Sequence, residues 1–351
     1  MNISRLAARA RVFAVLACCL LAVFCGGGST PTPTTPSTPS TPSTPTTPAP
    51  VTPTNTWSAE GKVTALGTSQ GIAGATLTPS WALAAVTADG QGAYQLGDVA
   101  NPPSTPYPVS VSATGYISHD VWITWARGPR TGVDLNLIRN AAPFSMDFYQ
   151  QFVRDGFDKS TGYPWRILRW TTAPSFYVRT VDQSGKPIEP EVLAVTLDAI
   201  RRAVPAYTGG VYGVAALETG TEVRPQVANW INVDIKRDPA ERSVCGRSFV
   251  GANPGLITLN DDVCSCGSRK IPGAVTMHEV GHALGFFHVS DRKSLMYPFA
   301  AGDCPAGELS AAEAFHAGIA YSRPRGNTDP DKDPSAGAAL VGDRSSGPLV
   351  R

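Results

Sequence analysis

Three histidines, a glutamate and a methionine lie close together in the stretch TMHEVGHALGFFHVSDRKSLMYP, residues 276–298. The whole chain of 351 residues has only five histidines, so three of them are concentrated here. His278 and His282 are four residues apart, which on a helix places both imidazoles on one face, about one turn apart. Two imidazoles that face one point favour a bound metal ion. An apolar helix that carries histidines by chance is the competing interpretation.

The third histidine, His288, follows six residues after His282 and cannot reach the same point on a straight helix. Gly285 lies between them and can end the helix, because glycine readily adopts the left-handed conformation found at helix ends. With the chain turned there, His288 can return as a third ligand. Three neutral imidazoles leave one coordination position open, as in catalytic zinc sites. Glu279 could hold a water molecule near that position, so the pattern predicts a catalytic zinc ion with Glu279 as general base.

The full pattern H-E-x-x-H-x-x-G-x-x-H runs without a gap from His278 to His288 and resembles the metzincin metalloproteases. Met296 follows eight residues later in SLMYP, where the resemblance implies a methionine beneath the zinc ligands. A tyrosine directly after that methionine, and then a proline, is similar to the matrixin branch. That resemblance implies that Tyr297 and Pro298 form part of the wall of the primed-side specificity pocket.

Other ions have less support in the sequence. Outside the motif only His119 and His316 remain, too few for the second, structural zinc ion of animal matrixins, so we expect one zinc ion. The run NDD at residues 260–262 could contribute oxygens to calcium, but no recognised calcium loop is present and calcium stays open.

The elements that would position the motif form a mixed α/β region, residues 140–324. Strands are predicted at SFYVRTVD, ANWINVDIK and GLITLNDD, and the last is our candidate for the edge strand with which an extended substrate would pair. Helices are predicted over EPEVLAVTLDAIRRAVPAYT and SAAEAFHAGIAY, where Ser310 and Glu313 have the spacing of a capping box. The resemblance implies a metzincin-like α+β catalytic domain with an active-site helix.

Residues 57–138 differ in character, with short β-like runs separated by turns. Apolar residues alternate in PVSVSATGY, with Val109 and Val111 on one face, and the two glycines of ADGQGAY predict a hairpin. The runs GATL, TADGQGAY and VSATGY resemble the carboxypeptidase regulatory-like family, which implies an accessory β-sandwich. His119, in this region, is interpreted as a surface or hydrogen-bonded histidine. The predicted fold class is an all-β sandwich followed by an α/β (α+β) catalytic domain.

The N-terminal segment predicts export. Basic residues precede the apolar run VFAVLACCLLAVF, which is too short to span a bilayer but fits a secretory signal. We interpret residues 1–25 as a lipoprotein-type signal with Cys25 as the acylated residue. Cys18 is a second candidate, and a plain cleaved signal is the alternative. Pro/Thr/Ser repeats at residues 26–56 predict an extended linker, and residues 325–351 are predicted to be a disordered tail.

Four further cysteines predict two disulfides in an exported region, the candidates being Cys245, Cys264, Cys266 and Cys304. A bond between Cys264 and Cys266 would be strained, so each is expected to join either Cys245 or Cys304. The charge is balanced, with 29 Lys+Arg against 28 Asp+Glu, and this balance does not favour nucleic acid as a partner.

These features together predict an exported, monomeric zinc endopeptidase that acts on proteins or peptides. It would be tethered to the cell envelope through its N-terminal lipid, or secreted. Two alternatives are a zinc hydrolase of a narrow non-protein substrate and an adhesion or binding lipoprotein whose zinc region is catalytically silent. The intact Glu279 favours an enzyme, because a silent site has no chemical need for this carboxylate.

Overall fold

A computed structural model describes most of the chain after the predicted linker. The described residues are 57–80, 84–99, 106–123, 128–157, 167–241, 244–261, 273–298, 307–327, 329–335 and 349–350. All of them belong to one compact unit, Pro53–Arg351. The predicted signal with Cys25, the linker and three of the disulfide candidates lie outside the described residues. In the described part, no helix is long and apolar enough to cross a bilayer.

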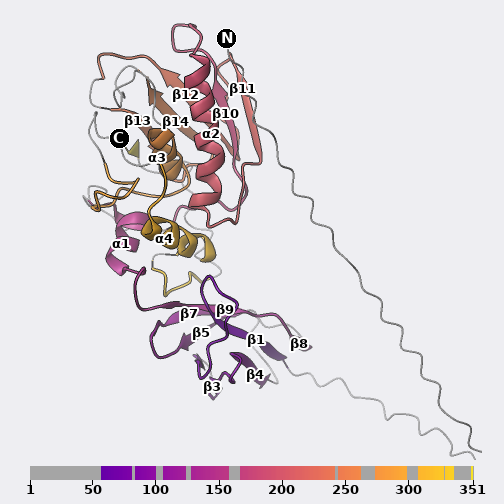
Figure 1. Ribbon diagram of the computed structural model, residues 1–351. Coiled ribbons are helices and arrows are strands. Elements are labelled where there is room, and N and C mark those ends of the chain that lie inside the picture. The colour runs from indigo at the N-terminus through magenta and orange to yellow at the C-terminus, as the bar shows by residue number, and fades with distance from the viewer. Residues whose placement is uncertain are drawn as a thin grey trace, which may run out of the picture. The chain divides into compact units, whose positions relative to one another are not determined.

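Two β-sheets share one apolar core in the N-terminal part of the described chain (Figure 1). The strands are β1 (Trp57–Ala65), β2 (Thr76–Pro79), β3 (Val86–Thr87), β4 (Ala93–Val99), β5 (Tyr107–Ser112), β6 (Tyr116–Ile117), β7 (His119–Ile123), β8 (Gly128–Arg130) and β9 (Leu135–Arg139). One sheet has the order β4-β1-β9-β6, with β8 also paired to β1, and the other has the order β3-β2-β5-β7. Val109 and Val111 of β5 are fully buried between half-buried neighbours, which confirms the predicted alternation.

The glycine-containing turn at residues 89–92 does not form the predicted hairpin. Asp89 closes the turn, because its carboxylate accepts from the backbone N–H groups of Gln91 and Ala93, both at 2.8 Å. The strands on either side then separate: β3 pairs with β2, whereas β4 pairs with β1 in the other sheet. The prediction was wrong because the local sequence marks the turn but does not determine the partner of each strand.

A mixed sheet organises the C-terminal part, with the order β11-β10-β12-β14-β13-β15. Its strands are β10 (Ser175–Arg179), β11 (Ala216–Gly220), β12 (Trp230–Lys236), β13 (Gly246–Phe249), β14 (Gly255–Asn260) and β15 (Leu349–Val350). The first four strands in the order are parallel, and β13 runs antiparallel to both β14 and β15. Because β14 is paired on both sides, the prediction that GLITLNDD is the edge strand is wrong.

The three longest helices lie close to where the sequence predicts them, whereas the helical segment at residues 146–155 was not predicted. The helical elements are α1 (Met146–Gln150), the π-helical turn η1 (Gln151–Asp155), α2 (Pro190–Tyr207), α3 (Gly273–Ala283) and α4 (Ala311–Ser322). The predicted capping box of α4 is confirmed: Ser310 Oγ accepts from the N–H of Glu313 at 3.2 Å, and the Glu313 carboxylate accepts from the N–H of Ser310 at 2.7 Å. In Figure 1, α2 and α3, which pack against each other, lie over one face of the sheet, with α3 against β13 and β14.

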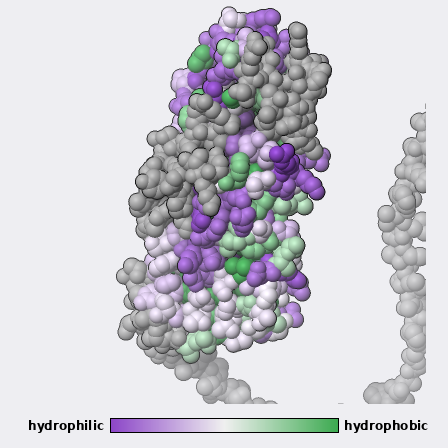
Figure 2. Space-filling model, turned by 90° about the vertical axis from the view of Figure 1, so that its left-hand side faces the viewer, coloured by the Kyte–Doolittle hydropathy of each residue, from purple (hydrophilic) through white to green (hydrophobic). Residues whose placement is uncertain are grey.

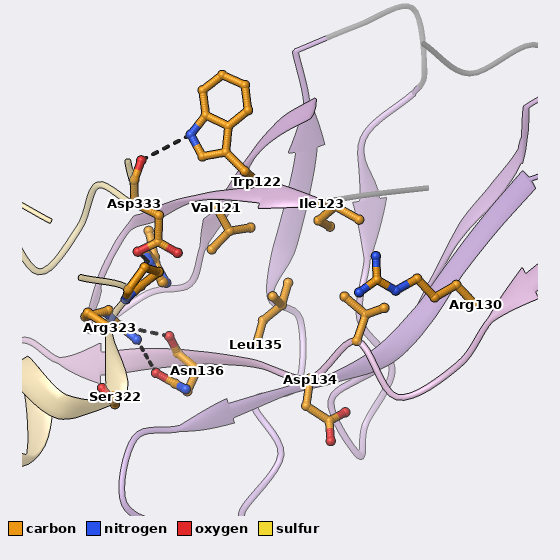
Figure 3. A pocket seen from close by; sticks show the side chains of 13 residues that line it. Val121, Trp122, Ile123, Arg130, Asp134, Leu135, Asn136, Ser322, Arg323 and Asp333 are labelled. Carbon is orange, nitrogen blue, oxygen red and sulfur yellow. Dashed lines mark hydrogen bonds and ion pairs between the residues drawn. The ribbon is translucent and has the colours of Figure 1, made fainter. Parts of the chain in front are cut away.

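Residues 329–335, which we call the strap, fasten the C-terminal part to β7. The sequence predicts a disordered tail here, but Asp333 is well connected. Its carboxylate accepts from His119 Nε2 at 2.9 Å, and its carbonyl accepts from Trp122 Nε1 at 3.1 Å (Figure 3). Its N–H also donates to the carbonyl of Asp120 at 2.9 Å. The strap therefore covers the free edge of β7, which satisfies backbone groups that water would otherwise hydrate.

Arg323, just before the strap, strengthens the same connection. Its side chain is 2% exposed, and it donates to the carbonyl of Pro330 at 2.9 Å and to both oxygens of Asn136. Beside these residues lies a cavity of about 240 Å³, also lined by Arg130 and Asp134 (Figure 3). Neutral oxygens thus hold the buried guanidinium at the contact between the strap and β9.

The apolar side chains are largely enclosed in the core between the two N-terminal sheets, in the core of the C-terminal part, and in a small cluster of Leu168, Val250 and Phe287. Among the described residues, the large apolar side chains that remain exposed are Trp122, Phe157, Val211, Val223 and Val227. On the face shown in Figure 2, apolar residues are interspersed with hydrophilic ones.

Candidate metal centre

Helix α3 and the turn after it bring the three motif histidines together. His278 and His282 lie one helical turn apart in α3, which ends at Ala283. Gly285 then adopts a φ of 109°, and its N–H donates to the carbonyl of His282 at 2.9 Å. The predicted break at this glycine is confirmed, and His288 returns to the same point as the two helical histidines.

The Nε2 atoms of the three rings converge. Those of His278 and His282 are 3.0 Å apart, and each is 3.1 Å from Nε2 of His288. These contacts are not a ring of hydrogen bonds. Nδ1 of His278 faces the carbonyl of Leu295 at 2.6 Å, and Nδ1 of His282 faces that of Phe286 at 2.8 Å, so both must carry the proton. A neutral imidazole has one N–H, and the Nε2 atoms of both rings therefore point lone pairs at a shared centre.

Burial keeps these rings neutral. Desolvation lowers the pKa of His278 to about 4 and that of His288 to about 3. Desolvation also lowers the pKa of His282 well below its usual range, and the two neighbouring imidazoles add to this effect. Protons are therefore weakly bound at the centre near neutral pH, whereas a metal cation would be stabilised by the same lone pairs.

The residues fit a zinc ion. Tetrahedral zinc with Zn–N distances of ~2.0–2.1 Å would set ligand nitrogens ~3.3–3.4 Å apart, slightly wider than the spacing seen here. The carbonyls of Leu295 and Phe286 orient two of the rings, as outer-shell acceptors do in zinc proteins. Within the described ranges, this is the one group of three or more His, Cys, Asp or Glu side chains whose ligand atoms converge. The geometry and the donor set therefore suggest a zinc site with three protein ligands.

Glu279 lies beside the triad and is almost completely buried. The residue is 4% exposed, its Oε2 has no hydrogen-bond partner among the described residues, and burial raises its pKa well above the usual range. The backbone of Gly246 in β13 passes directly against the carboxyl group, since a Cβ there would lie 2.4 Å from Glu279 Oε1. A buried carboxylate oxygen without a donor is costly in a purely structural role, and it fits a group that exchanges protons with a reactant.

Met296 packs below α3. It is fully buried, Tyr207 donates its hydroxyl to the sulfur at 3.1 Å, and a Cβ on Gly281 of α3 would lie 2.7 Å from that sulfur. Glu313 holds this segment, because its Oε1 accepts from the N–H of Met296 at 2.8 Å and from the hydroxyl of Ser294. The sequence identifies Glu313 as a helix cap, but no spacing pattern shows that the same carboxylate anchors residues 294–296.

Tyr297 and Pro298 follow Met296 and are partly exposed. The guanidinium of Arg292 lies 5.5 Å from the centre of the Tyr297 ring. Their predicted role in a specificity pocket stays a prediction. Of the four disulfide candidates, only Cys245 is among the described residues, where it packs against the main core, and the pairing also stays a prediction.

The residues considered for calcium have other partners. Asn260 Oδ1 accepts from the N–H of Asp238 at 3.2 Å, and the Asp261 carboxylate lies 3.5 Å from Nε of Arg237. Asp262 lies outside the described residues. Asn260 and Asp261 thus contribute to the support of the sheet end.

Comparisons with known proteins agree with this geometry over a short stretch. Residues 271–313 match the matrixin family, and this stretch contains the three histidines and Met296. No curated protein matches the chain. Two solved structures that match are type II cohesin–X-dockerin complexes from Acetivibrio cellulolyticus. An N-terminal interface mutant matches at 14% identity over 23% of this chain and 55% of that chain, with a TM-score of 0.18.

The second of these, a C-terminal interface mutant, matches at 11% identity over 26% of this chain and 65% of that one, with a TM-score of 0.19. This chain therefore spans less than two thirds of either match, and at such scores neither likeness bears on its fold or function. The matrixin match and the histidine triad together suggest that residues 273–298 form the metal centre of a zinc metallopeptidase.

Proposed function

We propose that this chain is a zinc-dependent endopeptidase with a metzincin-like, matrixin-type catalytic domain, preceded by an accessory β-sandwich. The observation that carries the proposal is the convergence of three imidazole lone pairs, together with a buried Glu279, adjacent in sequence to His278, whose Oε2 has no hydrogen-bond partner in the described part of the chain. We further propose that the chain is exported, acts as a monomer, and is held at the cell envelope by lipid on Cys25.

The chemistry follows from the positions of the side chains. A zinc ion held by His278, His282 and His288 would polarise the scissile carbonyl and lower the pKa of water. Glu279 takes the proton of the attacking water and passes it to the leaving amine. A general base that later acts as an acid works best with a pKa near the working pH, and burial raises the pKa of Glu279 from its usual range in that direction.

The substrate would bind as an extended strand. Strand β13 borders Glu279 through Gly246, and an extended peptide can pair with the outer side of such a strand by backbone hydrogen bonds. The preference for particular substrate side chains would come from the wall formed by Tyr297 and Pro298. In this proposal β13 is the strand that pairs with substrate, the role that the sequence assigned to GLITLNDD.

The test is to map new peptide N-termini by mass spectrometry after incubating a denatured protein mixture with the zinc-loaded chain. Glu279→Gln, which keeps the shape of the side chain, should reduce the yield of new termini by about 10²–10⁴-fold while zinc content stays at one per chain. Glu308→Gln is the matched control, because Glu308 is exposed and should leave cleavage unchanged. The absence of new termini from the zinc-loaded wild type would overturn the endopeptidase proposal.

A further inference from the structure

Strand β13 is the element of the sheet that lies nearest the catalytic groups. Its first residue, Gly246, lies against Glu279 so closely that a Cβ would be 2.4 Å from Oε1 and 2.6 Å from Cγ and Cδ. The turn after β13 is also fixed to α3, because the N–H of Gly251 donates to the carbonyl of His282 at 2.9 Å. The edge of β13 is therefore held in a fixed position beside the histidine triad.

One side of β13 pairs with β14, and the other side pairs with a segment from much later in the chain. Phe249 is opposite Leu349, and Ser248 is opposite Val350, in antiparallel register. Without β15, the outer backbone groups of β13 would form an open sheet edge, which is a ready template for any extended peptide. The structure thus shows this edge occupied by the chain itself.

The direction of β15 determines whether it would compete with a substrate strand. From Phe249 to Gly246, β13 runs back toward Glu279, and β15 is antiparallel, so the path from Leu349 to Val350 leads toward the catalytic glutamate. A substrate strand paired antiparallel to β13 would use the same backbone groups and the same direction. Substrate and β15 therefore cannot both occupy this edge.

We propose that the segment containing Leu349 and Val350 is an internal competitor that occupies the peptide-binding edge of β13 and must leave before substrate binds. The inference rests on the proposed function, since it names a second occupant of the same edge. A pairing of two residues is short, so the segment exchanges with substrate. Because the segment belongs to the same chain, its competition with substrate is intramolecular and takes place at a high effective concentration.

The variant that tests the proposal is Leu349→Pro/Val350→Pro. Proline has no N–H and cannot donate to a strand partner, so two adjacent prolines remove the donors of β15 whichever of the two residues makes the bond. Ser345→Pro/Ser346→Pro is the matched control, because it adds two prolines four residues earlier and leaves Leu349 and Val350 intact. A second test variant ends at Ser335 and retains the strap.

The first measurement does not depend on activity. Hydrogen–deuterium exchange of residues 246–249 should become faster in the proline pair and in the truncated chain, and should be unchanged in the control. A fluorescent peptide with the sequence of residues 343–351 should bind the truncated chain and bind the full chain more weakly. Unchanged exchange in β13, or equal binding to both chains, would overturn the proposal.

The second measurement is steady-state hydrolysis of a peptide by the zinc-loaded full chain. Releasing the competitor should lower KM by ~3- to 10-fold with kcat unchanged, since the edge is then available for a larger fraction of the time. An equal fall in KM in the control pair would count against the inference. If neither chain cleaves any peptide but β13 exchange still responds to the proline pair, the occupied edge stands and the proposed function fails.

Discussion

The chain places its histidines in two kinds of surroundings, and burial does not distinguish them. His278, His282 and His288 are 4%, 1% and 7% exposed, while His119 and His316 outside the motif are 4% and 0% exposed. His278, His282 and His316 also share one contact, because Nδ1 of each ring faces a backbone carbonyl. For His316 this is the carbonyl of Ala312.

The difference lies in what the second nitrogen meets. Nε2 of His316 accepts from the N–H of Ser145 at 3.0 Å, and Nε2 of His119 donates to Asp333, so in each of these rings Nε2 is hydrogen-bonded to a group of another residue. In the triad, the Nε2 atoms face one another instead. A buried histidine is thus a ligand candidate when its second nitrogen directs a lone pair at the lone pairs of other rings.

The carboxylates beside the two kinds of histidine, Asp333 and Glu279, differ in a similar way. Oδ1 of Asp333 accepts from both His119 and Nδ2 of Asn327, whereas Oε2 of Glu279 has no donor in the part of the chain that the structure describes. Hydrogen bonds to a carboxylate, such as the two to Asp333, stabilise the fold, whereas a buried carboxylate oxygen that lacks such bonds is available for chemistry. The contrast can be tested by substitutions in the two regions.

The largest expected effect is on metal content. His282→Ala removes one of three ligands, so zinc should fall from one ion per chain to none after dialysis, measured by mass spectrometry of the metal. The loss of affinity should exceed the ~10–100-fold that removal of an outer hydrogen bond costs. His316→Asn should retain one zinc ion, because Nε2 of His316 already accepts from a backbone N–H group and is not directed at the metal centre. Equal zinc loss in both variants would remove the distinction between the two kinds of histidine.

The next effect concerns the free carboxylate. Gly246→Ala introduces a Cβ at 2.4 Å from Glu279 Oε1, so the carboxyl group must move or β13 must shift. A displacement near 1 Å should lower kcat by about 10²-fold while zinc content stays at one per chain. Gly213→Ala is the control, because an added Cβ there meets no atom within 4 Å. Full activity of Gly246→Ala would show that β13 does not control the position of Glu279.

Local features of this centre could be predicted from the sequence. The spacing of the histidines, the break at Gly285 and the capping box at Ser310 each depend on residues within one or two turns. Their geometry follows from helix periodicity and from the conformational freedom of glycine. The convergence of His288 with the helical pair therefore follows from short-range spacing alone.

Features that depend on distant pairing could not be predicted. Strand β14 lies inside the sheet, with β13 and then β15 beyond it, and Glu313 holds Met296 as well as its own helix. The strap joins Asp333 to His119, which are 214 residues apart in the sequence. Such contacts leave no periodic pattern, because strand order and side-chain partners are fixed by the packing of the whole fold.

A smaller effect should appear in the pH dependence of stability without metal. In the unfolded chain the histidines titrate near ~6.5, whereas the pKa of His278 in the fold is about 4. The unfolded state then binds more protons below pH ~6.5, so the free energy of unfolding should fall as the pH drops from there toward 4. The fall should be on the order of 3 kcal/mol for His278 alone.

Urea unfolding at several pH values between 7.5 and 4.5 measures how the free energy of unfolding depends on pH. The series is run once with a chelator and once with zinc. Zinc occupies the same lone pairs as the protons, so the loaded chain should hold its midpoint to lower pH until the metal leaves. His316, whose pKa is also lowered by burial, should add the same slope to both forms. Identical curves with and without zinc would contradict the assignment of the triad as the metal site.

The smallest expected effect concerns the strap. Asp333→Asn keeps the shape of the side chain but weakens its bonds to His119 and Asn327, and it should lower the free energy of unfolding by ~1–2 kcal/mol. Zinc content and kcat should not change, because the hydrogen bonds of Asp333 go to residues outside the triad. A lower zinc affinity in Asp333→Asn, measured by chelator competition, would instead show that the solitary histidine and the metal centre are coupled. In that case, the hydrogen-bond partner of Nε2 alone would not distinguish a structural histidine from a metal ligand.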